Sequence, residues 1–187
     1  MRMGPRVQRT AADIVNESSE EELARIFLEF GEEPAGRRLA AHLVKVRSTS
    51  PILTTSDLVA AVQSVIPKRG PRHPATRVFQ ALRIAVNDEL RALERGLRGL
   101  SVWVKGGGRM AVLTFHSLED RIVKRYFREV SREWIDRPEW PAPKKNPAYA
   151  FRLITARPIE PSREEVRDNP RARSAKLRVI ERISHES

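Results

Sequence analysis

The run MAVLTF at residues 110–115, followed at once by HSLEDR at residues 116–121, decides how this chain folds. Six mostly apolar residues are too few for a helix, and their lack of alternation is typical of a strand buried on both faces of a parallel-type sheet. Ser117 and Asp120 have the spacing of a capping box, which predicts a helix from here to about Arg132. The sequence therefore places a strand, a tight corner and a helix at the centre of an α/β unit.

Further elements are expected on both sides of this corner. Apolar residues at spacings of four and three predict one long helix over residues 75–97, which a turn at Gly106 to Gly108 separates from the strand. The segment 133–148 is rich in proline, tryptophan and lysine and lacks periodicity, which predicts a surface loop. The chain should then continue with a strand at 152–158, a short helix from Ser162 to about Asp168, and a last strand at 175–183.

The first part of the chain shows helical periodicity broken by turn residues. Ser19 and Glu22 form a capping box, and Gly31 should end the helix that follows. Two more helices are expected at 34–46 and 56–65, the second stopped by Pro67. We therefore expect an all-helical lobe at residues 1–77 and a mixed α/β part at residues 78–187.

Composition limits the class of partner. The 187 residues contain 35 lysines and arginines against 24 acidic residues, a net charge of +11 that favours a polyanionic partner, with nucleic acid first. Because cysteine is absent, a disulfide framework and a thiolate metal site are excluded. The chain has no apolar run of about 20 residues and no signal-peptide pattern. We expect a soluble, cytoplasmic protein with no membrane partner.

The corner after the 110–115 strand is the sharpest candidate for chemistry. Ligands of open α/β sheets bind at the carboxyl ends of strands, where this sequence has His116, Glu119 and Asp120. Helix capping explains Ser117 and Asp120 equally well, since a capping box requires those residue types. A cap does not require an imidazole, so His116 is interpreted as a group for proton handling or base recognition.

Three sets of polar residues are candidate RNA contacts. Arginines at spacings of four, three and four form one stripe on the helix after the corner, although pairing with Glu129 and Glu133 on a solvated face is an equal alternative. A basic loop has no helix face to explain it, and a polar stripe on the 75–97 helix either reads base edges or is ordinary amphipathicity. The candidates are Arg121 and Arg125 on the stripe, Lys68, Arg69, Arg72 and His73 in the loop, and Gln80, Arg83 and Asn87 on the long helix.

A tetrapeptide at 146–149, NPAY, resembles the NPPY motif of amino-group methyltransferases. It lacks the second proline and follows the wrong strand. We do not interpret it as a site.

Three stretches together resemble a known family. They are HPATR at 73–77 with FQALRI at 79–84, FHSLEDRIVK at 115–124, and NPRARSAKL at 169–177. In this order they resemble the C-terminal portion of the bacterial ribosomal RNA small subunit methyltransferase H family, the MraW-type enzymes that methylate N4 of a cytidine in 16S ribosomal RNA.

The resemblance implies a fold. Residues 1–77 would be a helical insertion that recognises RNA, and the rest would be the C-terminal half of a Rossmann-like class I methyltransferase sheet, whose last three strands are 110–115, 152–158 and 175–183. The N-terminal half, with the glycine-rich turn that cradles S-adenosyl-L-methionine, is missing. Gly106 to Gly108 precedes a strand, whereas a cradling turn must follow one. We expect no donor binding by this chain alone, and self-association through the open edge of the 110–115 strand.

The resemblance also implies an activity, methylation of the exocyclic amine of the cytidine by direct attack on the donor methyl, without a metal. It places His116, Glu119 and Asp120 near the reacting amine, Gln80, Arg83 and Asn87 along the substrate channel, and the 68–73 loop on phosphate. The expected partners are small-subunit ribosomal RNA or the assembled subunit, and a separate donor-binding half. The alternative is a non-catalytic RNA-binding or ribosome-assembly module. A DNA-binding helical protein is a weaker reading, because the lobe has no recognition-helix signature.

Overall fold

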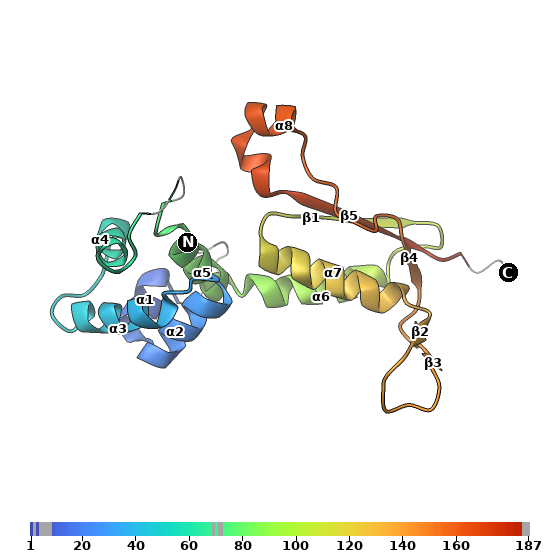
Figure 1. Cartoon of the computed structure of the whole chain (residues 1–187), viewed down its shortest axis with the longest axis horizontal. Coiled ribbons are helices and arrows are strands. Elements are labelled where there is room, and N and C mark those ends of the chain that lie inside the picture. The colour runs from blue at the N-terminus through green and yellow to red at the C-terminus, as the bar shows by residue number, and fades with distance from the viewer. Residues whose placement is uncertain (2, 4–8, 69, 71–72, 185–187) are drawn as a thin grey trace. The chain divides into compact units, whose positions relative to one another are not determined.

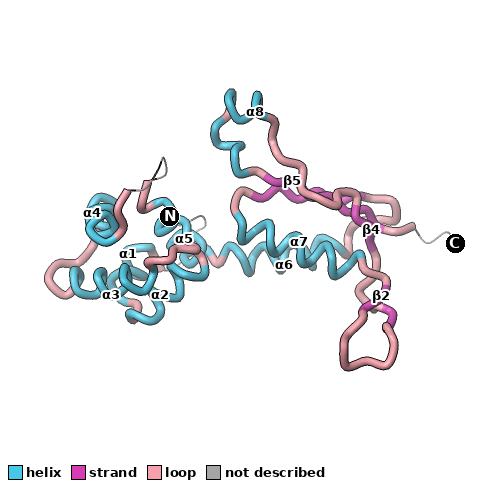
Figure 2. Tube along the Cα trace, viewed as in Figure 1, coloured by secondary structure: helices cyan, strands magenta, loops and turns pink. Residues whose placement is uncertain are grey.

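The computed structural model describes residues 1, 3, 9–68, 70 and 73–184, which fall into two compact units, Met1–Glu89 and Leu90–Ser187. The first unit is helical, and the strands described belong to the second (Figures 1 and 2). The helices of the first unit are α1 (Ala11–Glu17), α2 (Glu20–Glu29), α3 (Gly36–Arg47), α4 (Thr55–Val65) and α5 (Thr76–Asn87).

Side-chain caps start α1, α2 and α4. Ser19 accepts a hydrogen bond from the backbone N–H of Glu22, which confirms the predicted start of α2. Thr10 and Thr54 form full capping boxes with Asp13 and Asp57 at the starts of α1 and α4. The expected helices at 34–46 and 56–65 are confirmed as α3 and α4, within a residue or two at each end.

The core of the helical unit is one continuous apolar cluster. Its largest fully buried side chains are Phe27, Leu23, Leu39, Leu43, Leu82, Val15, Val62 and Val78. Gly31 lets the end of α2 approach α5, because a Cβ at this position would lie 2.7 Å from the Phe27 carbonyl oxygen and 2.9 Å from that of Arg77. The predicted turn at Gly31 is therefore also a packing requirement.

The expected single helix over 75–97 is wrong. Asp88 adopts a left-handed conformation with φ of 49°, which ends α5 at Asn87, and α6 (Glu89–Ser101) starts anew. Aspartate tolerates this conformation better than most residues. The apolar spacing continues from α5 into α6, so the spacing alone could not show that the helix is interrupted at Asp88. By packing, α5 belongs to the helical unit. The boundary expected after residue 77 concerns function, and this division by packing does not test it.

The sheet of the second unit has the order β1-β5-β4 in the described residues, formed by β1 (Arg109–Thr114), β5 (Lys176–Arg182) and β4 (Phe151–Leu153). Both pairings are antiparallel, and Met110 lies opposite Ile180. The expected strands at 110–115 and 175–183 are confirmed, whereas the one at 152–158 is limited to β4.

Burial of β1 on both faces, as expected from its apolar run, is wrong. Met110 and Thr114 are buried, whereas Ala111 is exposed and Leu113 is 54% exposed. The reason is that α7 (Ser117–Ser131) covers one face of the sheet, and Figure 1 shows α6 and α7 running together along that side. Within the described residues, β1 pairs with β5 along one edge, and its other edge has no partner strand.

The second core lies between α7, the end of α6 and the sheet. Val123, Phe127, Phe151 and Ile180 are its most buried side chains. The expected helix after Ser162 is confirmed as α8 (Arg163–Asp168), followed by the 3-10 turn η1 (Pro170–Ser174), and the expected loop at 133–148 contains the small hairpin of β2 (Trp134–Ile135) and β3 (Lys144–Lys145). Among the described residues, no helix is long and apolar enough to cross a membrane.

Candidate functional site

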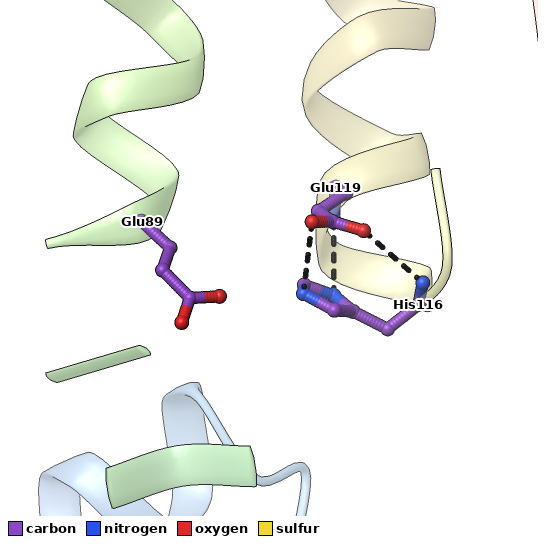
Figure 3. Close-up of side chains that lie close together, drawn as sticks. All are labelled: Glu89, His116 and Glu119. Carbon is purple, nitrogen blue, oxygen red and sulfur yellow. Dashed lines mark hydrogen bonds and ion pairs between the residues drawn. The ribbon is translucent and has the colours of Figure 1, made fainter. Parts of the chain in front are cut away.

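The corner between β1 and α7 is capped by His116, not by Ser117. His116 Nδ1 accepts a hydrogen bond from the Glu119 backbone N–H (3.3 Å), and the Glu119 carboxylate accepts from the backbone N–H groups of Phe115 (2.8 Å) and His116 (3.3 Å), as Figure 3 shows for the last of these. This is a reciprocal capping box with an imidazole in place of a hydroxyl. The predicted Ser117–Asp120 box is therefore wrong, and so is the argument that a cap leaves the imidazole unexplained.

The cap fixes which nitrogen of the neutral His116 ring carries the proton. Because Nδ1 is an acceptor, the neutral ring carries its proton on Nε2, which lies 3.5 Å from Glu119 Oε1. The His116 side chain is 9% exposed and that of Glu119 is 23% exposed. Since Nδ1 is used by the cap and Nε2 carries the proton, the acceptor that the corner offers is the Glu119 carboxylate, next to an aromatic ring that is 53% exposed at Phe115.

Asp120 faces the protein interior, where it forms a bidentate pair with Arg178 of β5. The Arg178 Nε donates to Oδ1 at 2.7 Å and Nη2 donates to Oδ2 at 3.0 Å, with both side chains nearly buried. The Arg178 hydrogen bonds lower the pKa of Asp120, against a smaller opposing effect of burial and with help from Lys176 and Lys124. A carboxylate held in this way is a weak base, so the geometry favours an anchoring role for Asp120.

The arginine stripe lies on the outer face of α7. Arg121 and Arg125 are exposed, as are the two arginines that follow them, Arg128 and Arg132. Arg125 also lines a pocket of about 190 Å³ between α6 and α7, where Arg98 contacts Glu129 (3.5 Å) and lies over the Tyr126 ring. This volume is below the roughly 300 Å³ at which ligand pockets begin, so the stripe is a surface and not a cavity.

The three predicted residues of α5 make local contacts. Gln80 donates to the Phe30 carbonyl oxygen (3.1 Å), and Arg83 forms a bidentate pair with Glu89 at 2.9 Å. Asn87 donates to the Arg83 carbonyl oxygen (2.8 Å). Gln80 thus ties α5 to the end of α2, Arg83 ties it to the first residue of α6, and the Asn87 contact lies within α5. These contacts explain the polar stripe without a ligand, and a role in the substrate channel stays a prediction.

The basic loop is described in part. Lys68 is exposed, and so is His73, whose Nδ1 accepts from the Ala75 backbone N–H at 3.2 Å. Arg69 and Arg72 lie outside the described residues. The loop thus presents at least one exposed cation directly before α5.

The glycine turn before β1 does not fit the methyl donor. The Gly107 backbone N–H donates to the Arg182 carbonyl oxygen (2.9 Å), and that of Gly108 donates to Lys105 (2.8 Å), so both amides are already used. A Cβ at Gly108 would lie 2.8 Å from the Lys105 carbonyl oxygen, which explains the glycine by a tight turn. A donor cradle needs free amides at a helix N-terminus, which this turn does not offer.

Two features of the second unit were missed from the sequence. The pair of Arg178 with Asp120 was not predicted, although an arginine on the inward side of an apolar strand implies a buried acidic partner. The hairpin at 134–145 lies in the segment predicted to be a surface loop, because strands of two residues leave no periodicity to detect.

Comparison with known proteins gives the class. The MraW methylase family model matches residues 1–183, and the chain belongs to that family, which confirms the predicted resemblance. Among curated relatives, the chain is 50% identical to ribosomal RNA small subunit methyltransferase H of Geobacter sp. (strain M21), over 98% of this chain and 60% of that protein.

Two other relatives carry the same name. The chain is 48% identical to the protein of Thermomicrobium roseum, over 100% of this chain and 57% of that protein, and 45% identical to that of Halothermothrix orenii, over 98% and 60%. The chain therefore spans about 60% of the length of the curated relatives it matches.

Proposed function

We propose that this chain is the substrate-recognition and sheet-completing part of an enzyme that transfers a methyl group from S-adenosyl-L-methionine to the N4 amine of a cytidine in small-subunit ribosomal RNA. The observation that carries the proposal is the family match over residues 1–183, together with relatives named ribosomal RNA small subunit methyltransferase H at 45–50% identity.

In this proposal the β1–α7 corner holds the target base. Phe115 offers an exposed ring for stacking, and the Glu119 carboxylate, positioned by His116, offers an acceptor for the amine of an unpaired cytidine. The base must leave its strand to reach the corner, because chemistry on a base edge requires access. Asp120 serves the site indirectly, by holding the first turn of α7 to β5 through Arg178.

Basic surfaces of each unit hold the RNA backbone. On the helical unit these are Lys68 and the rest of the 68–73 loop, and on the second unit the exposed stripe that contains Arg121 and Arg125. Their function needs only charge and exposure, since phosphate contacts position an RNA without reading its sequence. The substrate channel along α5 remains part of the proposal.

Salt-dependent binding of the purified chain to a decoding-region fragment of small-subunit ribosomal RNA tests this function. We expect tighter binding to the fragment than to random duplex DNA. Lys68→Gln and Arg125→Gln should each reduce the slope of log K against log salt by about 0.7 to 0.9, the share of one phosphate contact. The matched control is Arg25→Gln, because Arg25 already pairs with Glu29 (3.2 Å) on α2. Equal affinity for the two nucleic acids would contradict the proposal.

The donor belongs to a part that this chain does not supply. Isothermal titration of the chain with S-adenosyl-L-methionine should show no saturable heat at micromolar concentrations, because the glycine turn uses its amides internally. Saturable heat in that range would place a donor site in this chain and overturn its assignment as the substrate-recognition part alone.

A further inference from the structure

The hairpin of β2 and β3 is fixed at its root by a buried asparagine. Asn146, 5% exposed, donates from Nδ2 to the carbonyl oxygens of Glu129 (2.7 Å) and Arg132 (2.8 Å), and its Oδ1 accepts from the Ala148 backbone N–H (3.0 Å). Its own backbone N–H donates to Glu133 (2.8 Å). The last turn of α7 is thereby joined to the hairpin, so the hairpin leaves the second unit from a rigid base (Figure 1).

In the loop between the two strands, the Trp140 ring contacts two cations. The guanidinium of Arg137 lies 4.9 Å from the centre of the Trp140 ring, and the ammonium of Lys144 lies 4.8 Å from it. Such cation–π contacts stabilise an exposed loop by about 0.5 to 1 kcal/mol each. The tip of the hairpin thus keeps its shape without a core of its own.

A second tryptophan is presented to solvent from this rigid frame. Trp134 lies opposite Lys145 in the ladder and is 56% exposed, whereas Ile135 lies opposite Lys144. Because opposite residues of an antiparallel pair share a face, Trp134 and Lys145 stand side by side on one face of the hairpin. Among the described residues, the second core does not include Trp134, so packing does not account for it.

We infer that the face formed by Trp134 and Lys145 binds single-stranded RNA, with the indole stacked on an unpaired base and the ammonium on a neighbouring phosphate. Stacking suits this surface better than phosphate attraction alone, because Asp136 and Glu139 offset much of the positive charge of the hairpin. Every base has a π face, and in a duplex that face is covered by its neighbours, so the site selects unpaired RNA. The choice of RNA as the polyanion rests on the proposed function.

The test measures affinity of the full chain for a short unstructured pyrimidine RNA and for an RNA duplex of equal length. Trp134→Ala should weaken binding to the single strand by roughly 5- to 100-fold and leave binding to the duplex unchanged. Trp134→Phe should retain part of the affinity. The matched control is Trp103→Ala, because Trp103 is a tryptophan of the same unit, 83% exposed and outside the hairpin, and it should bind as the parent does.

A third variant separates stacking from charge. Lys145→Gln should reduce the salt slope for the single strand by about 0.7, with a small loss of affinity. Parental binding by Trp134→Ala overturns the inference, and so does an equal loss for duplex and single strand. If the parent and Trp134→Ala bind the ribosomal RNA fragment equally well, the hairpin site fails while the proposed function stands. If the parent binds no RNA, both fail.

Discussion

The two units differ in how completely they cover their apolar residues. In the described part of the helical unit, the large hydrophobic side chains that remain exposed are Met1, Met3 and Leu53. In the second unit they are Leu100, Val102, Trp103, Leu113, Phe115, Trp134, Leu153, Ile154 and Ile159. The helical unit closes on itself, whereas the second unit presents apolar surface that another surface can cover.

The interiors differ as well. The helical unit is held by a continuous apolar cluster, whereas the second unit also depends on ion pairs across its sheet. Arg178 pairs with Asp120 on one face, and Glu181 accepts hydrogen bonds from Arg109 and Arg152 on the other. Loss of a charged side chain or a fall in pH should therefore lower the stability of the second unit strongly. The stability of the helical unit, which depends on apolar packing, should change little.

The largest effect is expected from Arg178→Met. The change leaves the Asp120 carboxylate nearly buried without its partner, which should lower the free energy of unfolding of the second unit by about 3–5 kcal/mol. Urea unfolding followed separately by tryptophan fluorescence, which reports the second unit, and by circular dichroism measures this. The control is Arg173→Met, an exposed arginine of η1. If the free energy of unfolding of the helical unit fell by the same amount, the two units would not differ in their dependence on this ion pair.

The second-largest effect is expected from acid, which should destabilise the second unit before the helical unit. Arginine partners lower the folded-state pKa of Asp120 and of Glu181, so their contribution to stability is present above the ordinary carboxyl pKa and is lost as pH falls through the lowered value. In the helical unit, hydrogen bonds within the Thr54 cap lower the pKa of Asp57, but this group is exposed and screened. Below about pH 4 the tryptophan signal should change before the helical signal. The reverse order contradicts the account.

Self-association through the open edge of β1 should also depend on the exposed face beside that edge. Leu113→Lys places a charge on the uncovered face of β1, where it should reduce dimer or larger species severalfold and change the unfolding free energy by no more than about 0.5 kcal/mol. Sedimentation velocity over a range of concentrations measures this. Leu53→Lys, at a leucine that is 69% exposed in the helical unit, is the matched control and should associate as the parent does. Association that persists in Leu113→Lys shows that another surface is responsible.

The smallest expected effect on stability is that of His116→Ala. Loss of the cap of α7 should cost about 1 kcal/mol, within the usual range for N-cap residues. His116→Asn, which keeps a capping acceptor, should recover most of it. If both variants unfold like the parent, the imidazole does not cap the helix in solution.

Much of the architecture could be predicted from sequence because it rests on local signals. The cap at Ser19, the helices ended by turn residues, the apolar strand at 110–115 and the last strand are each encoded within a few residues. The family could be predicted because three separate motifs occur in order.

The features that were missed depend on distant partners. Asp120 faces the interior because its partner Arg178 lies on a strand far along the chain. Leu113 is exposed because it lies on the face of the sheet that α7 does not cover, and the apolar run of β1 does not show that only one face is covered. The break between α5 and α6 depends on the left-handed backbone conformation of Asp88. The hairpin at 134–145 depends on the hydrogen bonds by which Asn146 joins it to the end of α7.

Methyl transfer by a joined protein tests the central claim most directly. The part of the Geobacter relative that this chain does not match would be joined to this chain, and the product incubated with labelled S-adenosyl-L-methionine and small ribosomal subunits. We predict label at N4 of a single cytidine with the fused protein, none with this chain alone, and a large loss with His116→Ala. A fused protein that binds the donor and the RNA yet transfers no methyl group would contradict the account, as would methylation by this chain alone.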